Sequence, residues 1–322
     1  MKTIGIFCGG FSSEFDISIK SATTIKNHLP SDFLSFKIIV SKTKWEVEAG
    51  TEMVSFNLND CSFLFQGKKI ILDAAIVYIH GDPGENGKIQ AFLDMHNIPY
   101  INSGALASAL SFDKWYCNQF LRGFGFEVAQ SKLFHFGAEI ETTALVADLG
   151  LPLFVKPADS GSSYGISKVK AAHEVQNAFD IAFKEGKTVV AEAFLDGIEV
   201  TCGVFRSTKG LIALPLTEIV SETEFFDYAA KYDGKSKEIT PARIAETMRD
   251  EVQAQAKKIY DLLGLRGIAR IDFMLVQNKP YVIEVNTTPG FSPASIVPQM
   301  LGVAGISIQD FWKEMIKVEL DM

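Results

Sequence analysis

The stretch "RIDFMLVQNKPYVIEVNTTPG", residues 270–290, decides the fold of this chain because it has the pattern of a β-hairpin. Two runs rich in β-branched and aromatic residues flank the polar turn at 277–280. Side chains alternate between the faces of a strand, so Arg270 shares a face with Asp272, and Glu284 shares one with Asn286. Polar residues on such apolar strands require an explanation.

Two explanations fit this hairpin. A buried carboxylate is stable only when it is paired or bound to a cation, and Asp272, Glu284 and Asn286 offer the hard oxygen donors that magnesium prefers. The alternative is a solvated sheet face with an ion pair between Arg270 and Glu284. The turn "NTTPG" after the second strand adds backbone donors that could face an anion. The pattern alone leaves both explanations open.

The N-terminal third of the chain alternates strands and helices. The apolar run 3–8 is followed by a Gly turn and a helical stretch over 14–29. The run 74–80 repeats this order, with a Gly-rich loop, a helical stretch and the short strand "PYIN". This alternation predicts a doubly wound parallel α/β domain over residues 1–103.

The rest of the chain has a different pattern. A helical stretch over 106–125 and a strand over 151–157 begin a second unit, placed at 104–186. From there to residue 322, longer strands with hairpin spacing predict an antiparallel α+β unit over 187–322. The polar stretch 221–240 lacks periodicity and predicts a long loop, which in a compact domain is usually functional.

Composition excludes several classes of protein. The 322 residues are 47% hydrophobic and 22% charged, and no run of 18 apolar residues could span a bilayer. The N-terminal apolar run is too short for a signal peptide, so we expect a cytoplasmic protein. A net charge of −8 argues against nucleic-acid binding. The scattered cysteines indicate neither a zinc site nor a disulfide framework.

A Gly/Ser loop follows the strand that ends near Lys156. The text "FVKPADSGSSYGISKV" (154–169) offers one cation and several backbone and hydroxyl donors, which together suit phosphate oxygens. It is not a Walker loop, and "CGGFSS" does not match the dinucleotide fingerprint. Taken singly, such a loop is most often a plain turn, Glu14 fits a helix start, and His80 fits a structural role.

Taken in order, the motifs resemble the D-alanine:D-alanine ligases of the ATP-grasp superfamily. The resemblance runs from residue 5 to about residue 300. It implies an ATP-grasp fold, in which two antiparallel sheets clamp ATP, after the N-terminal parallel domain. The matching text is "GGFSSEFDIS", "HGDPGENGKIQ", "IPYINSGALASALSFDK", "LPLFVKPADSGSSYGISKV", "AEAFLDGIEVT", "FFDYAAKY", "ARIDF" and "IEVNTTPGFSPASIVP".

The resemblance also implies roles in binding ATP and metal. Asp272, Glu284 and Asn286 would bind two magnesium ions, or manganese in their place, that bridge the phosphates. Lys114 and Lys156 would hold the α and β phosphates. The further residues implied for ATP are Ser163, Glu192, Phe194, Leu195, Glu199 and Lys231.

The implied reaction makes D-alanyl-D-alanine for peptidoglycan precursors. The γ-phosphoryl group moves to the carboxylate of one D-alanine, and the amine of a second D-alanine attacks the resulting acylphosphate. Glu14 would hold the first ammonium in a network with Ser162 and Tyr232, while Arg270 and the Gly290 amide would stabilise the oxyanion. The other substrate-binding residues implied are His80 and Ser295.

The loop 221–240 would then be a lid that protects the acylphosphate from water. It carries Lys231, which would reach the γ phosphate, and Tyr232, which in this family accompanies dipeptide formation. Two departures stand out: Asn86 replaces the usual Asp, and "FSPAS" (291–295) replaces the usual acceptor-site text. D-lactate or D-serine therefore remains an alternative acceptor.

Two alternatives lie outside the ligases. A nucleotide-binding regulatory protein that has lost catalysis would be expected to lack some of the matched charged residues, and all of them are present. A plain doubly wound binding module would show no ATP turnover with any amino acid. The resemblance further implies a homodimer formed through the N-terminal domain.

Overall fold

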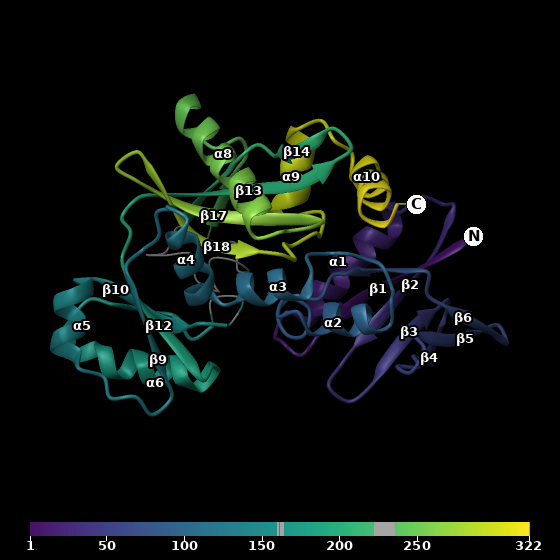
Figure 1. Ribbon diagram of the computed structural model, residues 1–322, viewed down its shortest axis with the longest axis horizontal. Coiled ribbons are helices and arrows are strands. Elements are labelled where there is room, and N and C mark those ends of the chain that lie inside the picture. Colours follow the sequence, from purple (N-terminus) through teal and green to yellow (C-terminus); the bar gives the residue numbers. More distant parts are fainter. Residues whose placement is uncertain (160, 162–163, 222–235, 322) are drawn as a thin grey trace.

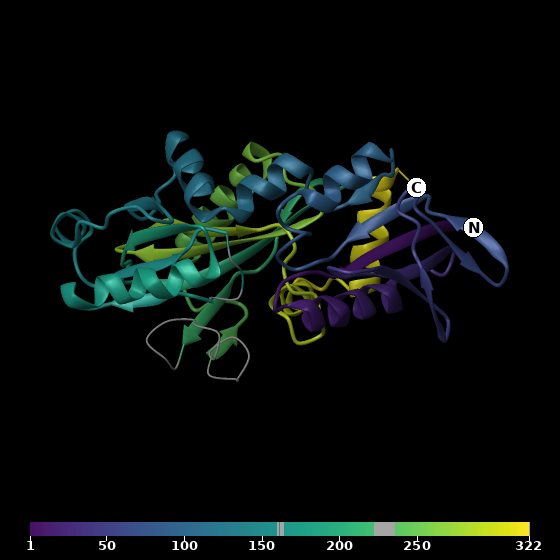
Figure 2. The same cartoon turned by 90° about the horizontal axis from the view of Figure 1, so that it is seen from below.

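The computed structural model describes residues 1–159, 161, 164–221 and 236–321. In this part of the chain the strands form three main sheets and the small hairpin β5 (Ser62–Phe65) and β6 (Lys68–Ile71). Figures 1 and 2 show an elongated molecule, with the N-terminal sheet at one end and the central sheet at the other. In the view of Figure 1 the C-terminal sheet lies above the central sheet.

The N-terminal sheet has the strand order β4-β3-β2-β1-β7-β8. Its strands β2, β1, β7 and β8 run parallel, which confirms the predicted doubly wound core, and β3 and β4 add an antiparallel edge at the other end. β1 is buried from its second residue onward, as expected when both faces of a parallel sheet are covered. The elements are β1 (Lys2–Gly9), α1 (Phe15–His28), β2 (Phe33–Val40), β3 (Trp45–Ala49), β4 (Glu52–Ser55), β7 (Ala74–Val77), α2 (Lys88–Met95) and β8 (Tyr100–Ile101).

The central sheet is antiparallel, with the order β11-β10-β12-β9. Its strand β12 lies beyond residue 186, where the sequence pattern placed the end of the second unit, so this sheet extends to Ala193. The sheet to which a strand belongs depends on the strands that pair with it, and the local sequence pattern does not specify those partner strands. The elements are β9 (Ser131–His135), α5 (Thr142–Leu149), β10 (Leu153–Pro157), β11 (Ser167–Val169), the 3-10 turn η1 (Ala172–Glu174), α6 (Val175–Glu185) and β12 (Thr188–Ala193).

The C-terminal sheet has the order β16-β15-β13-β17-β18, with β14 paired to β13. The predicted hairpin is confirmed, with Gln277 and Asn278 at positive φ in a two-residue turn. The ends of the predicted loop 221–240 belong to β15 and β16, which corrects the prediction there; residues 222–235 lie outside the described part. The elements are β13 (Ile198–Ser207), β14 (Gly210–Ala213), β15 (Thr217–Ser221), β16 (Ser236–Ile239), α8 (Glu246–Leu262), β17 (Ile268–Val276) and β18 (Lys279–Asn286).

The helix predicted over 106–125 is two helices, α3 (Ala105–Phe112) and α4 (Lys114–Gly123). Asp113 breaks it, because its backbone is extended and its side chain accepts the N–H groups of Trp115 (3.0 Å) and Tyr116 (2.9 Å). An aspartate that caps a helix in this way offers the backbone an alternative to continuing the preceding helix. The break places Lys114 in the first turn of α4.

The C-terminal helices α9 (Ile296–Val303) and α10 (Ile308–Leu320) connect the N-terminal and C-terminal sheets. Phe311 and Trp312 of α10 share one buried cluster with Ile4 of β1 and Phe205 of β13. The C-terminal end of the chain therefore lies beside the N-terminal sheet (Figure 1). Among the described helices, none combines the length and apolar character needed to cross a membrane.

Candidate active site

One cavity of about 710 Å³ is lined by strands of the central and C-terminal sheets and, from the N-terminal unit, by the start of α1 and the loop after β7. Every predicted site residue in the described part of the chain lines it. The predicted residues that fall outside the described part are Ser162, Ser163, Lys231 and Tyr232. Those that line the cavity are Glu14, His80, Lys114, Lys156, Glu192, Phe194, Leu195, Glu199, Arg270, Asp272, Glu284, Asn286, Gly290 and Ser295.

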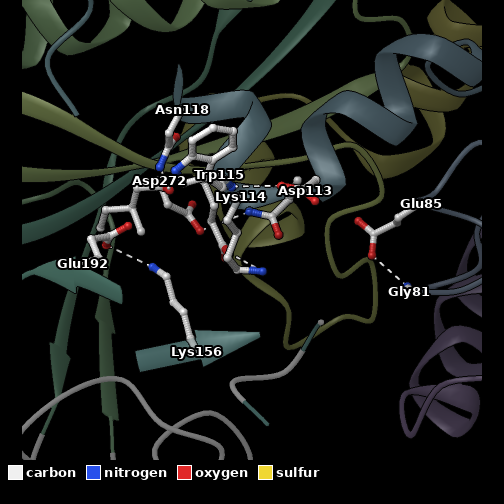
Figure 3. Close-up of polar contacts among 12 residues, drawn as sticks. Gly81, Glu85, Asp113, Lys114, Trp115, Asn118, Lys156, Glu192 and Asp272 are labelled. Carbon is white, nitrogen blue, oxygen red and sulfur yellow. Dashed lines mark hydrogen bonds and ion pairs between the residues drawn. The ribbon is translucent and has the colours of Figure 1, made fainter. Parts of the chain in front are cut away.

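A buried ion pair lies on the central sheet. Lys156 on β10 and Glu192 on β12 are 6% and 7% exposed, and their charged atoms Nζ and Oε1 are 3.0 Å apart. Figure 3 shows the Lys156 ammonium directed toward Glu192. Because a buried charge is tolerated only with a partner, Glu192 keeps the Lys156 cation in place at the cavity wall. The Lys156 ammonium is therefore already positioned before a phosphate group binds in the cavity.

A second lysine reaches the cavity from α4. Lys114 Nζ lies 3.6 Å from Glu284 Oε2 on β18. The Lys114 backbone N–H also donates to the carbonyl of Ala158, at the end of β10, over 2.9 Å. Helix α4 is thereby fixed to the strand that carries Lys156. Both lysines are thus positioned by the two sheets between which the resemblance places ATP.

The polar face of the hairpin is largely removed from solvent, since the Arg270 and Glu284 side chains are only 16% and 21% exposed, and this argues against the solvated alternative. Asp272 is only 6% exposed, and both its oxygens accept hydrogen bonds from Arg270, at 2.9 and 2.8 Å. Asn286 Nδ2 donates to Asp272 Oδ2 over 3.1 Å. The alternative ion pair of Arg270 with Glu284 was thus wrong, because Asp272 lies on the same strand face and receives the guanidinium. Burial acts to lower the pKa of Arg270, but the Asp272 charge raises it above its ordinary value overall.

The donor set suits a hard cation that also binds phosphate. Asp272 and Glu284 are cross-strand partners, and Asn286 follows two residues later on β18. In the described part of the chain, no group of three or more His, Cys, Asp or Glu side chains is arranged to hold a metal. Two carboxylates and one amide oxygen leave coordination positions for phosphate oxygens and water, the environment that magnesium usually keeps. The residues present therefore fit magnesium bound together with a nucleotide.

Glu14 lies where the Gly/Ser loop meets the first helix. It is the N-cap residue of α1, yet its side chain makes no capping hydrogen bond there, so capping does not explain it. Its Oε2 lies so close to Gly161 that a Cβ added to this glycine would be 2.5 Å away. The carboxylate therefore lies close to the backbone of Gly161.

His80 is a buried residue of the cavity wall. Its Nδ1 lies 2.8 Å from the Thr288 carbonyl, so Nδ1 is the donor, and its Nε2 lies 3.2 Å from Ser21 Oγ. Burial lowers the pKa of His80, although the negative charge of Glu14 acts in the opposite direction. The lowered pKa favours the neutral ring. Both ring nitrogens contact the protein, so the ring is well placed to hold Thr288.

The acceptor end contains Gly290, Ser292 and Ser295. Ser295 Oγ accepts the N–H of Ser292 at 3.0 Å and lies 2.8 Å from Ser292 Oγ. A Cβ added to Gly290 would be 3.0 Å from Ser295 Oγ, so the tight approach of this turn favours glycine. Ala294, part of the departure at 291–295, also lines the cavity.

The sequence analysis missed three acidic residues of the cavity, Glu85, Asp196 and Glu238. Burial, with the charge of Glu14 as the next cause, raises the pKa of Glu85 from 4.5 to about 8. Burial also raises the pKa of Glu238, whose Oε2 accepts from Gln299 over 3.0 Å. Glu85 stands inside the motif "GENG" and could have been singled out there. Glu238 lies within the stretch 221–240, which lacks periodicity, so the sequence pattern gave no reason to select it.

Comparisons with known proteins identify the family of the chain. The family model for the D-ala D-ala ligase N-terminus matches residues 3–103, and that for the C-terminus matches residues 120–317. A D-alanine--D-alanine ligase of Azobacteroides pseudotrichonymphae is 41% identical, over 98% of this chain and 99% of that protein.

Two solved structures are similar along their whole length. The VanG D-Ala:D-Ser ligase of Enterococcus faecalis has a TM-score of 0.88 at 30% identity, covering 99% of each chain. The D-alanine--D-alanine ligase of Bacillus anthracis complexed with ATP has a TM-score of 0.80 at 26% identity, covering 100% of this chain and 98% of that one. The chain belongs to the D-alanine:D-alanine ligase family of ATP-dependent, ATP-grasp enzymes.

Proposed function

We propose that the chain joins two D-alanines into D-alanyl-D-alanine, with ATP converted to ADP and phosphate, for peptidoglycan precursor synthesis. The observation that carries the proposal is the convergence of the described predicted residues on one cavity. Residues matched to the nucleotide, to the metal and to both amino acids come from the N-terminal unit and from the central and C-terminal sheets, and line the same cavity. Family membership over both halves of the chain supports the same activity.

ATP would lie between the central and C-terminal sheets. Lys114 and Lys156 would contact the α and β phosphates, and the apolar side chains of Phe194 and Met274 would pack against the base. The ring of Phe154 lies 5.9 Å from that of Phe194, which gives the wall an aromatic surface. ATP itself is supported by the family, and this placement is part of the proposal.

Magnesium would be held by Asp272, Glu284 and Asn286, whose oxygen donors suit it. When bound, two such ions offset the negative charge that develops on the phosphates during transfer. The chain's own contribution is to keep both carboxylates on one face of the hairpin, where Asp272 is buried and accepts a hydrogen bond from Thr201 Oγ1 at its Oδ1. This hydrogen bond orients Asp272 from the neighbouring strand β13.

The first step activates one D-alanine. Its carboxylate oxygen forms a bond to the γ phosphorus while the bond to the ADP oxygen breaks, which gives an acylphosphate and ADP. Glu14 would pair with the ammonium group of this D-alanine and hold its carboxylate toward the phosphate. Arg270 would stabilise the negative charge, because its guanidinium is fixed at the cavity wall by Asp272.

The second step forms the peptide bond. The amine of the second D-alanine, having lost a proton, attacks the acyl carbon, and the tetrahedral oxyanion then collapses with loss of phosphate. Arg270 and the Gly290 N–H would donate to this oxyanion, the kind of preorganised donor pair that lowers such barriers most. Ser295 would bind the carboxylate of the second D-alanine, at the end of the cavity lined by Ser292.

The proposal includes four residues outside the described part of the chain. Their roles follow from the resemblance alone: Ser162 and Tyr232 in the network with Glu14, Ser163 and Lys231 at the phosphates. The stretch 221–240 would then cover the acylphosphate and exclude water. Tyr232 supports dipeptide formation over ester formation.

Three further features are proposed on the same basis. The chain would have three units, and we place the end of the second unit after β12, because this strand completes the central sheet. It would form a homodimer through the N-terminal unit and act in the cytoplasm, where nucleotide-dependent precursor synthesis has access to ATP. Size measurement by light scattering tests the dimer.

An alternative acceptor is favoured by one observation, the departure at 291–295. Pro293 and Ala294 replace the usual family residues, Ala294 lines the cavity, and a D-Ala:D-Ser ligase is among the similar structures. Competition separates the two functions: the enzyme receives ATP, magnesium and D-alanine with an equal amount of D-serine or D-lactate, and the products are identified by mass. Predominant D-alanyl-D-alanine supports the proposal; predominant mixed product supports the alternative.

A further inference from the structure

The turn 287–290, here called the oxyanion turn, is held by side chains of the N-terminal unit. Tyr78 donates its hydroxyl to the Pro289 carbonyl over 2.8 Å, and His80 donates to the Thr288 carbonyl over 2.8 Å. Both come from the chain segment at the end of β7. The turn that carries Gly290 in the C-terminal unit therefore takes its position from a different sheet.

Asn102, which follows β8, binds the same turn. Its Nδ2 lies 3.1 Å from Thr288 Oγ1 and 3.3 Å from the Thr287 carbonyl, and also 3.0 Å from the Val77 carbonyl at the end of β7. Thr287 and Thr288 are 3% and 2% exposed. The oxyanion turn is thus buried against the N-terminal sheet and shares its hydrogen bonds.

Glu85 also connects the N-terminal unit to the oxyanion turn, through hydrogen bonds to both of its carboxylate oxygens. Its Oε2 accepts the N–H of Gly81 at 2.8 Å, and its Oε1 accepts the N–H of Thr288 at 3.3 Å (Figure 3 shows the first). The side chain also lines the cavity. One carboxylate therefore joins the loop after β7 to the oxyanion turn, two residues before Gly290.

We propose that Glu85 is a positioning residue of the ligase reaction, which holds the Gly290 N–H toward the oxyanion by fixing the Thr288 N–H. The inference rests on the proposed function. Both oxygens of the carboxylate are used as acceptors, and an amide in its place offers only one acceptor oxygen. The other N–H would then face an NH₂ group, and the turn would shift to relieve the contact.

The charges around Glu85 argue against a merely tolerated residue. Glu14 lies on the other side of Gly81: a Cβ on Gly81 would be 3.8 Å from Glu14 Oε2, while the Gly81 N–H donates to Glu85. The Glu14 and Glu284 charges both raise the pKa of Glu85, after burial itself. A second carboxylate beside Glu14 is electrostatically unfavourable, and the paired N–H bonds give a reason for its presence.

The test compares Glu85→Gln with Asp82→Asn on the same loop. Asp82 makes its hydrogen bonds to Asn86 (2.6 Å) and Lys88 (2.7 Å), so its change removes an equal charge without touching the oxyanion turn. The assays are run at about pH 9, above the pKa of Glu85 of about 8, so that its carboxylate is ionised. We expect Glu85→Gln to lower kcat there by about 10- to 100-fold, the scale of a small displacement of a catalytic donor. The KM for ATP stays within about twofold. We expect Asp82→Asn to leave kcat and the KM values for ATP and D-alanine unchanged.

A double-mutant cycle with Tyr78→Phe separates positioning from general loosening. Tyr78→Phe removes only the hydroxyl that donates to Pro289, on the other side of the same turn. If both residues position the turn, their effects on kcat are not additive, and the double variant loses less than the product of the single losses.

Three results would overturn the inference: unchanged kcat in Glu85→Gln, a parallel rise in the KM for ATP, or strictly additive losses in the cycle. Melting temperatures are measured alongside, because a structural role would lower the melting temperature without the selective loss of kcat. Inactive wild-type protein would instead contradict the proposed function, so the two failures remain distinguishable.

Discussion

Arg270 donates to both carboxylate oxygens of Asp272, its neighbour but one on β17, at 2.9 and 2.8 Å. The proposed oxyanion donor and the proposed metal ligand are thus one hydrogen-bonded pair on a buried strand face. Because the carboxylate fixes the guanidinium, the orientation of the donor exists before any substrate binds. This preorganisation is what makes electrostatic stabilisation effective.

Arg270→Ala tests the donor. We expect kcat to fall by about 10²- to 10³-fold, as when an oxyanion donor is removed, while ATP still binds. The matched control is Arg243→Ala, which removes an arginine paired with Glu218 and absent from the residues that line the cavity. Kinetics and calorimetric ATP titration measure both variants. Near-normal turnover in Arg270→Ala would contradict the proposal that Arg270 stabilises the oxyanion.

Asp272→Asn tests the metal site. The amide is a weaker ligand for magnesium than the carboxylate, so the magnesium concentration for half-maximal activity should rise. Asp261→Asn is the control, since Asp261 is an exposed residue paired with Arg206. A magnesium titration gives the comparison. Identical titration curves for wild type and Asp272→Asn would contradict the assignment.

Lys156→Met tests the buried ion pair at the nucleotide. Loss of one partner leaves the Glu192 carboxylate buried and unpaired, which should lower the free energy of unfolding by about 3 kcal/mol and weaken ATP binding. The double variant Lys156→Met with Glu192→Leu should recover stability but not ATP affinity. Urea unfolding and ATP titration measure the two effects. Recovery of ATP affinity in the double variant would show that Lys156 does not bind phosphate.

Glu85 should make stability depend on pH. Its pKa is about 8 in the folded chain and near 4.5 when unfolded, so the folded state binds more protons between these values. Its contribution to the free energy of unfolding therefore falls as pH rises from about 4.5 to 8, and levels off above that. The difference in unfolding free energy between wild type and Glu85→Gln should follow this trend. A difference independent of pH would contradict the raised pKa.

Much of the site could be predicted from the sequence because its residues occur in ordered motifs. The polar face of the hairpin could be predicted from the local sequence, because polar residues that are two positions apart on an apolar strand lie on the same face of the sheet. The pattern could not choose between a solvated and a buried face. That choice depended on Asp272 accepting Arg270 and on the central sheet covering the cavity.

Other features depended on contacts between distant segments. The central sheet includes β12 because β10 and β9 pair with it, and no local pattern specifies these partners. Asp113 breaks a helix through a cap that the apolar periodicity does not show. Glu85 reaches Thr288 only after α9 and α10 bring the N-terminal and C-terminal sheets together. Sequence motifs thus predicted which residues meet, and the structure adds what holds them in position.

The most direct test of the proposed ligase reaction follows oxygen. The enzyme receives ATP, magnesium and D-alanine whose carboxylate carries ¹⁸O, and mass spectrometry identifies both products. Attack of the carboxylate on the γ phosphorus, followed by amine attack on carbon, predicts D-alanyl-D-alanine and phosphate that contains one ¹⁸O atom for each peptide bond formed. Unlabelled phosphate, or ATP turnover without the dipeptide, would contradict the account.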